Sequence, residues 1–272
     1  MKDKKRNLII IEIIGLLLAL LWISPFYLMI VNAFKTKKEI FSGVLGLPEG
    51  FETNNFVQAF QDLDFINSLF NSLLITVVGV GIIILFSSMA GYALARNKSK
   101  LSGLILLLFV AAMLIPFQSV MIPLVSLFSK ADMLNRAGLI FMYLGFGSSL
   151  SIFLYHGAMT GISTSLDEAA IIDGANKFQV FWHIIFPLLK PISVTVGILN
   201  VIWIWNDYLL PSLILSDENA TIPIKMFLFF GQYTKQWHLA LAGLTIAIIP
   251  VIIGYFFAQK QIIEGVSEGA VK

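Results

Sequence analysis

Six long apolar runs restrict this chain to a membrane-spanning fold. A helix needs roughly 20 residues to cross a hydrocarbon core about 30 Å thick, because each residue adds about 1.5 Å. The runs that meet this length comprise residues 8–34, 68–94, 104–128, 139–159, 192–213 and 239–258. The composition agrees, since 58% of the 272 residues are hydrophobic and 12% are charged, against about 45–50% and about 25% in soluble domains. We therefore expect an all-α bundle of six transmembrane helices that forms one domain, residues 1–272.

Two of the six runs contain residues that disturb an apolar helix. Pro116 and Pro123 lie in the third run. Membrane helices tolerate proline where neighbouring groups satisfy the freed carbonyls, so we expect a kinked helix there. The fifth run contains Asn200, Asn206 and Asp207, which makes it the least clear of the six.

Basic residues indicate the orientation of the bundle. The two tight clusters are Lys2, Lys4, Lys5 and Arg6 before the first run, and Arg96, Lys98 and Lys100 after the second. Because cytoplasmic loops are enriched in lysine and arginine, we expect both clusters and both chain termini in the cytoplasm. Three lysines after the first run argue for the opposite orientation, but their longer loop also carries acidic residues. The first run exceeds the 7–15 residues of a signal-peptide core, so we interpret it as a membrane anchor.

Residues suited to catalysis or metal binding do not cluster in the sequence. The chain has no cysteine, and its three histidines, His156, His183 and His238, lie in different segments, whereas a metal site needs three or four convergent ligands. No paired catalytic acids or activated serine stand out. The sequence also lacks a GxxxxGK[ST] phosphate loop, so any ATP must be hydrolysed by another polypeptide. We expect no enzyme activity, bound cofactor, metal site or nucleic-acid partner.

The segment between the fourth and fifth runs, residues 161–191, is longer than a turn requires. Ser165 and Glu168 have the spacing of a capping box at the start of a helix. Gly174 supplies the left-handed residue that commonly ends one. We therefore expect a first short helix that is closed by a glycine.

A second short helix is expected in the same segment. It can begin at Asn176, a favourable N-cap residue, and continue to Phe186 before Pro187 and Pro191 end it. The residues expected along one side of it are Phe178, Phe181, Trp182 and Ile185. On physical grounds alone, two interpretations are equally supported. Glu168 could cap its own helix while the aromatic residues rest on the membrane surface, or the pair of helices could bind another protein.

Several motifs resemble one transporter family. Glu168-Ala169-Ala170, followed by Gly174 and an apolar stretch closing on Pro187, resembles the cytoplasmic loop of permease subunits in binding-protein-dependent ABC importers. The segments that resemble carbohydrate permeases are Asn71-Ser72-Leu73, Ala90 to Arg96, Ile115-Pro116, Ile122-Pro123 and Trp205-Asn206-Asp207. Residues 259–272 are similar to the end of the smaller permease of maltose-type systems. Residues 259–261 depart from the family, in which an arginine is common there.

The resemblance implies a subunit that forms half of a translocation pathway in a bacterial or archaeal cytoplasmic membrane. It implies a second related permease, two copies of an ABC ATPase that bind ATP and magnesium, and an extracytoplasmic sugar-binding protein. Residues 161–191, the coupling segment, are then expected to bind the ATPase. The residues implied in this contact are Glu168, Ala169, Ala170, Asp173, Gly174 and Pro187. The C-terminal tail, residues 259–272, is implied as a second contact through Gly265, Glu268 and Gly269; its alternative interpretation is a flexible, disordered end.

Polar residues inside apolar runs are candidates for the pathway or its gate, because they are costly in lipid. The candidates are Asn200, Trp203, Asn206 and Asp207 on one side of the fifth run, with Asn71 and Gln118 as weaker ones. We favour interhelical or gate contacts over direct contact with sugar.

Other functions remain open at this stage. The solute could be glycerol phosphate or an amino acid, because selectivity depends largely on subunits that this sequence does not contain. An ion-coupled secondary transporter would carry inverted repeats and carboxylates at mid-membrane, yet only Asp207 lies deep in a run. A channel subunit would not need a projecting coupling segment.

Overall fold

The computed structural model describes residues 2–231 and 235–270, with side chains described for residues 10–231 and 235–260. Helices make up the regular structure of this part of the chain, which also contains an isolated antiparallel bridge between Phe230 and Lys235. The all-α prediction is confirmed. The chain divides into two compact units: a first unit of Met1–Phe65 with Lys225–Ile253, and a second of Ile66–Ile224 with Gly254–Lys272.

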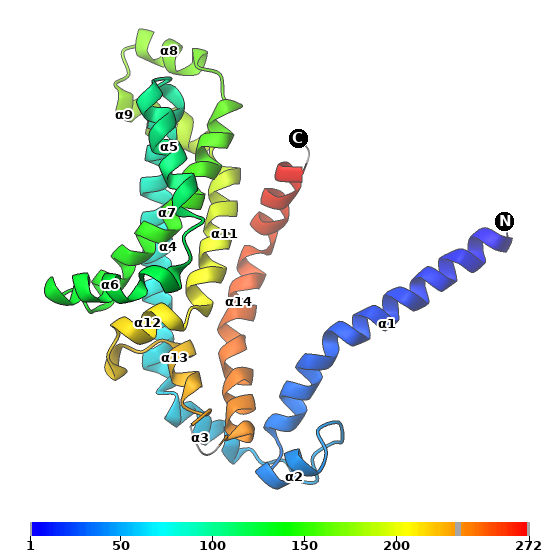
Figure 1. The fold of residues 1–272 in the computed structure, drawn as a ribbon. Helices are drawn as coiled ribbons and strands as arrows, with labels where there is room; N and C mark the ends of the chain where they lie inside the picture. Colours follow the sequence, from blue (N-terminus) through cyan, green and yellow to red (C-terminus); the bar gives the residue numbers. More distant parts are fainter. Residues whose placement is uncertain (1, 232–234, 271–272) are drawn as a thin grey trace. The chain divides into compact units, whose positions relative to one another are not determined.

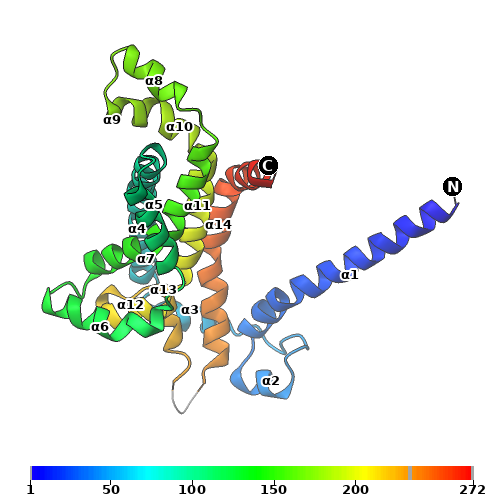
Figure 2. The same cartoon turned by 45° about the horizontal axis from the view of Figure 1, so that its top comes forward.

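The second unit holds most of the helices. They are α4 (Phe65–Arg96), α5 (Lys100–Ala112), α6 (Phe117–Lys130), α7 (Arg136–Thr160), α8 (Ser165–Ile172), α9 (Lys177–Val180), α10 (Phe186–Leu188), α11 (Lys190–Asn206) and α12 (Leu209–Ile214), with a π turn at Phe181–Ile185 and a 3₁₀ turn at Asp217–Asn219. Helix α7 packs against both α5 and α11. Figures 1 and 2 both show α8 and α9 at one end of this unit, beyond the ends of α7 and α11.

The core of the second unit lies between α4, α7 and α11. Ile83, Tyr143, Tyr155 and Val196 are buried there. A Cβ atom on Gly91 of α4 would lie 2.6 Å from Tyr155 Cβ, so α4 and α7 approach each other closely because this residue has no side chain. The Tyr155 hydroxyl donates a hydrogen bond to Ser193 Oγ on α11 at 2.8 Å. These contacts fix α7 to its two neighbours.

The first unit contains the chain's first helices and the beginning of its last one. Its helices are α1 (Lys2–Ala33), α2 (Lys37–Ser42), α3 (Asn54–Asp62) and the first part of α14 (Trp237–Ala270), while α13 (Ile222–Phe227) spans the boundary in sequence. The buried Asn55 side chain donates to the carbonyls of Ala33 and Lys35, both at 2.9 Å. This pair of bonds fastens α3 to the end of α1.

Four helices are long and apolar enough to cross a membrane: Ile10–Ala33, Phe65–Arg96, Arg136–Thr160 and Trp237–Lys260. Two further pairs of helices pass the same test together but are sharply bent, Lys100–Ala112 with Phe117–Lys130 by 102°, and Lys177–Leu188 with Lys190–Asn206 by 75°. The described residues therefore provide four spans, or up to six if each bent pair crosses as one. The predicted number of six is the upper limit of this range.

The prediction of one kinked helix over the third apolar run is wrong. The run is divided into α5 and α6, and the backbone is extended at Pro116, with φ −68° and ψ 137°. Proline lacks the N–H needed for a helical hydrogen bond and disfavours helical geometry at the residue before it, so a break here is physically reasonable. Pro123 lies inside α6 without ending it.

The fifth apolar run is also not continuous. Helix α11 ends at Asn206, Asp207 is extended, and α12 begins at Leu209. The Asp207 carboxylate accepts a hydrogen bond from the Leu209 backbone N–H at 3.1 Å. An aspartate bonded to the backbone two residues later favours a turn over a helix. This local bond accounts for the end of α11.

Candidate coupling site

The first helix of the coupling segment is α8, and its start differs from the prediction. Its N-cap residue is Thr164, which makes no side-chain cap bond. The Ser165 hydroxyl is instead 2.7 Å from that of Ser163. The predicted capping box of Ser165 and Glu168 is therefore wrong. Among the described residues, none bonds the exposed Glu168 carboxylate, which leaves this charge available to a partner.

The end of α8 agrees with the prediction made from Gly174. This glycine has φ +90°, a conformation that residues with a Cβ atom rarely adopt. The Ala175 N–H donates to the Ala170 carbonyl at 2.9 Å, and the Gly174 N–H donates to the Ile171 carbonyl at 3.0 Å. These two bonds form a Schellman motif, which satisfies the last carbonyls of a helix and turns the chain sharply.

The second helix of the segment begins where the sequence predicts. Asn176 is the N-cap of α9 and forms a capping box with Gln179, through bonds of 2.8 and 3.0 Å. Helical backbone continues through the π turn and α10 as far as Leu188. The prediction that Pro187 ends the helix is thus wrong. Pro187 is the second residue of α10, directly after the π turn changes the hydrogen-bonding register, and proline is tolerated in such a first turn.

The predicted stripe of apolar residues on one side of the second helix is also wrong. Phe181 is 3% exposed and Ile185 is buried, whereas Phe178 is 67% exposed and Trp182 is also exposed. A π turn joins residues five apart instead of four, so it changes the direction in which the following side chains point. The stripe is therefore divided between the interior and the surface.

Asp167 is the main functional candidate that the sequence did not reveal. Its carboxylate accepts from Arg96 Nη2 at 2.8 Å, from Arg96 Nε at 3.3 Å and from the Tyr92 hydroxyl at 2.6 Å. Arg96 Nη1 also donates to the Ile162 carbonyl at 3.1 Å. The side chains of Arg96 and Asp167 are 17% and 12% exposed. This partly buried ion pair joins α8 to the last turn of α4.

The Phe181 ring reinforces this junction. Its centroid lies 5.4 Å from that of Tyr92, within the range of favourable aromatic contacts. The Arg96 guanidinium lies 5.9 Å from the Tyr92 ring centroid. Two parts of the coupling segment, α8 and the π turn, therefore rest on the same end of α4.

The inner and outer faces of the coupling segment differ in character. Asp167 and Ala170 of α8 are buried, and so are Val180, Phe181 and Ile185 of the second helical stretch. The residues exposed on the outer side include Glu168, Ala169, Ile171, Ile172, Asp173, Gly174, Phe178 and Pro187. Of the residues implied by the resemblance, only Ala170 belongs to the inner face.

Two of the pathway candidates make their hydrogen bonds inside the second unit. Asn71 Oδ1 accepts from Arg136 Nη1 at 3.0 Å, and its amide nitrogen donates to the carbonyls of Glu218 and Ala220 at 3.3 and 3.2 Å. The buried Asn200 donates to Ser151 Oγ on α7 at 3.2 Å. Both side chains serve as contacts between elements of this unit.

The remaining pathway candidates differ in their surroundings. Tyr143 of α7 donates to Asp207 Oδ2 at 2.9 Å and meets the Trp203 ring edge to face at 5.3 Å. Trp203, Asn206 and Gln118 are exposed. The structure thus brings Asn200, Trp203 and Asp207 together against α7, while Gln118 lies on α6.

The tail residues Gly265, Glu268 and Gly269 belong by backbone to α14, which continues to Ala270. The side chain of Glu268 lies outside the described residues. The backbone is helical where the composition of the tail predicts a flexible segment.

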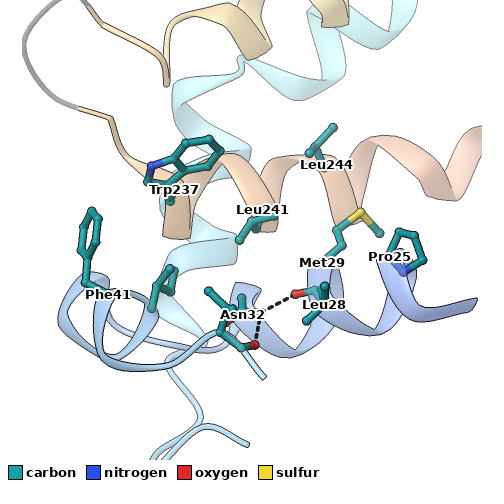
Figure 3. A pocket seen from close by; sticks show the side chains of 10 residues that line it. Pro25, Leu28, Met29, Asn32, Phe41, Trp237, Leu241 and Leu244 are labelled. Atoms are coloured by element: carbon teal, nitrogen blue, oxygen red, sulfur yellow. Dashed lines mark hydrogen bonds between the residues drawn. The ribbon is translucent and has the colours of Figure 1, made fainter. Parts of the chain in front are cut away.

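A separate groove of about 710 Å³ lies in the first unit (Figure 3). Its lining residues are Pro25, Leu28, Met29, Asn32, Ile40, Phe41, Val44, Trp237, Leu241 and Leu244. The Asn32 amide nitrogen already donates to the carbonyls of Leu28 and Val44, at 2.7 and 2.9 Å. A sugar presents many hydroxyl groups and needs several convergent polar side chains. This largely apolar groove does not provide them.

Comparisons with known proteins identify related transport proteins. Residues 83–267 match the family described as "Binding-protein-dependent transport system inner membrane component", a range that contains both Arg96 and the coupling segment. The chain is 54% identical to the probable starch degradation products transport system permease protein AmyC of Thermoanaerobacterium thermosulfurigenes, over 97% of this chain and 96% of that protein. It is 36% identical to the multiple sugar-binding transport system permease protein MsmG of Streptococcus mutans, over 93% of both. It is 34% identical to the melibiose/raffinose/stachyose import permease protein MelC of Bacillus subtilis, over 99% and 98%.

A solved structure shares the fold. One chain of a bacterial ABC transporter that imports the acidic polysaccharide alginate matches with a TM-score of 0.78 and 24% identity, over 96% of this chain and 98% of that one. Because the family match and the sequence relatives cover most of the chain, the assignment does not depend on the fold alone. The chain belongs to the family of binding-protein-dependent transport system inner membrane components.

Proposed function

We propose that this chain forms half of the membrane pathway of a carbohydrate importer, and that its coupling segment binds a separate ATPase. As a member of its family, the chain is a permease subunit of a binding-protein-dependent ABC importer, a transport component of the inner membrane and not an enzyme. The three relatives described above are named for starch products, multiple sugars and raffinose-type oligosaccharides, which supports a carbohydrate as the solute. They favour a sugar over glycerol phosphate or an amino acid.

The proposed docking site rests on one observation. The outer face of α8 is exposed, while Asp167 on its inner face is bonded to Arg96 and Tyr92 of α4. Ile172 is 84% exposed at the end of α8 and Phe178 is 67% exposed nearby in the chain. Exposed apolar side chains that gather on one segment commonly mark an interaction site. Ala169 is also exposed on α8 and adds little bulk, so another backbone can approach this helix closely.

The charges on this outer face favour a basic partner. Glu168 and Asp173 are both exposed, and no described residue bonds the Glu168 carboxylate. An ATPase cleft with apolar walls and a lysine or arginine at its edge would therefore complement α8. Gly174 sets the angle between the two helical stretches, and Pro187 is exposed near the end of the second.

The orientation that places this face in the cytoplasm is supported by the basic loop after α4. The junction between α4 and α5 carries Arg96, Lys98 and Lys100 and lies at the same end of the second unit as α8 and α9 (Figure 1). Arg96 is paired there with Asp167 of α8. Lysine and arginine concentrate on the cytoplasmic side of membrane proteins. We propose that the coupling segment and both chain termini lie on that side.

The proposed assembly contains a second related permease, two copies of the ATPase with ATP and magnesium, and an extracytoplasmic binding protein. The binding protein is supported by analogy with the bacterial alginate ABC transporter, whose structure contains a periplasmic protein bound to an alginate pentasaccharide and matches this chain at a TM-score of 0.63 and 18% identity. In this assembly, we assign Trp203, Asn206 and Gln118 to the pathway or gate, because each keeps an exposed side chain. Asn71, Asn200 and Asp207 are assigned to contacts within this chain.

A charge reversal at Glu168 tests the proposed docking site. The Glu168→Arg variant should insert in the membrane at the wild-type level but retain little ATPase on co-purification, and sugar uptake should fall with it. The matched control is Glu52→Arg, which reverses an exposed acid in the other unit. Wild-type ATPase recovery and uptake in Glu168→Arg would show that this face does not bind the ATPase.

A further inference from the structure

We infer that the ion pair of Arg96 and Asp167 is the mechanical link through which the coupling segment moves α4. This inference rests on the proposed function of the coupling segment. Residues 161–191 are continuous in sequence with α7 and α11, so those two helices must follow any movement of the segment. Helix α4 is not adjacent to it in sequence, because 71 residues separate Arg96 from Asp167. Its movement must therefore be driven through side-chain contacts. The close approach of Gly91 to Tyr155 connects α4 to α7, whereas the pair of Arg96 and Asp167 connects it directly to α8.

The geometry of the pair suits it to transmit both direction and force. Two nitrogens of the Arg96 guanidinium donate to the two oxygens of the Asp167 carboxylate. Such a two-bond arrangement fixes the relative orientation of the two groups, whereas apolar side chains can slide past one another. The third guanidinium nitrogen donates to the Ile162 carbonyl, so Arg96 holds the chain both before α8 and within it.

Tyr92 makes the junction more rigid. Its hydroxyl donates to Asp167 Oδ1, and its ring contacts Phe181 of the π turn. The pair is also shielded from water, since both side chains are less than one-fifth exposed. Screening by salt is weak for partly buried charges, so the link keeps its strength at physiological ionic strength.

The opposite end of α4 is fastened to another part of the chain. The side chains of Asn67 and Asn71 donate to carbonyls of Glu218 and Ala220, and Ser72 Oγ accepts from the Ile222 N–H at 2.9 Å. Helix α4 has 32 residues and is therefore about 48 Å long. A rigid helix fastened at both ends carries displacement along its whole length. We assign α4 as the rod that connects the coupling segment to residues 218–222 on the far side of the bundle.

The absence of cysteine from the sequence allows a direct test. Three variants are made: Arg96→Cys, Asp167→Cys and the double variant. Each is purified as a complex with the ATPase, the second permease and the binding protein. While their cysteines are kept as free thiols, all three variants should show roughly tenfold less stimulation of ATP hydrolysis by the sugar-loaded binding protein. A tenfold loss lies within the usual range of coupling between two sites. A short bis-methanethiosulfonate, which joins the two thiols of the double variant through disulfide bonds with loss of two sulfinates, should restore stimulation, and reduction of those disulfides should abolish it again.

Two controls separate this inference from the proposed function. The Lys98→Gln variant removes an exposed charge two residues after Arg96, between α4 and α5, and should leave stimulation of ATP hydrolysis unchanged. The ATPase should co-purify with every cysteine variant, because Asp167 lies on the inner face of the segment and Arg96 lies on α4, away from the exposed residues proposed to bind the ATPase. If the ATPase is absent from the wild-type complex, the proposed function fails. If it is present and the cysteine variants are stimulated normally, or the bridged double variant regains no stimulation, the link fails.

Discussion

Substitutions at Gly174 test how backbone strain alone, without any steric clash, affects the coupling segment. No heavy atom lies within 4 Å of a Cβ placed on this residue, but its φ is +90°. A new Cβ would therefore contact no neighbouring atom, and the free-energy cost of the substitution would arise from backbone strain alone. A left-handed conformation costs an ordinary L-residue roughly 1–2 kcal/mol, while asparagine adopts it more readily and β-branched residues adopt it least readily.

The expected order of activity follows from these energies. Gly174→Asn should remain near the wild type. Gly174→Ala should destabilise the bent conformation by about 1 kcal/mol, and Gly174→Val should destabilise it by about 2 kcal/mol or more. Since each 1.4 kcal/mol is a tenfold change in population, valine should reduce the bent conformation about 30-fold relative to alternative loop conformations.

The assay is ATPase stimulation and sugar uptake by the complete complex, with equal membrane insertion verified for each variant. Trypsin cleavage at Lys177, which follows the bend, gives an independent measure of the loop conformation. Valine should speed cleavage and slow uptake together. The reasoning is wrong if valine transports as well as glycine, or if asparagine is as damaging as valine, because backbone strain would then not determine the effect.

Two further predictions concern packing in the second unit. Gly91→Leu should lower the free energy of unfolding of the detergent-solubilised chain by about 1–3 kcal/mol, because its Cβ would lie 2.6 Å from Tyr155 Cβ. The control is Gly81→Leu, whose Cβ would have no atom within 4 Å. Equal melting temperatures of the two variants would contradict the close approach of α4 and α7. Tyr143→Phe removes the donor to Asp207 and should cost about 1–3 kcal/mol, so a melting temperature equal to the wild type would show that this bond contributes little.

The parts of the structure that sequence reasoning predicted depend on local chemistry. Apolar length gave the positions of the four unbroken spans, and Gly174 and Asn176 marked the end of one short helix and the start of the next. Each of these signals acts within a few residues of its own position, so it can be read without knowledge of the fold. The break at Pro116 was not predicted, because proline in a membrane helix is compatible with either a kink or a complete break.

The parts that were missed depend on distant contacts. Asp167 precedes the Glu168-Ala169-Ala170 motif directly, yet its importance comes from Arg96, which no local pattern connects to it. The helical spacing of Asp167 and Ala170 was an available signal, because residues three apart share one face of a helix. The π turn after α9 gave no recognisable sequence signal, and it divided the aromatic residues between two faces.

Photo-crosslinking along α8 tests most directly whether the coupling segment binds an ATPase. A photoreactive residue at Ile172, which is exposed, should form a covalent adduct with the ATPase in membranes that contain the whole transporter. The same residue at the buried Ile185 should form none. An adduct at position 172 that mass spectrometry identifies as a phosphate-loop ATPase is the predicted result. Crosslinking that captures no ATPase at position 172, in a complex that imports sugar, would contradict the account.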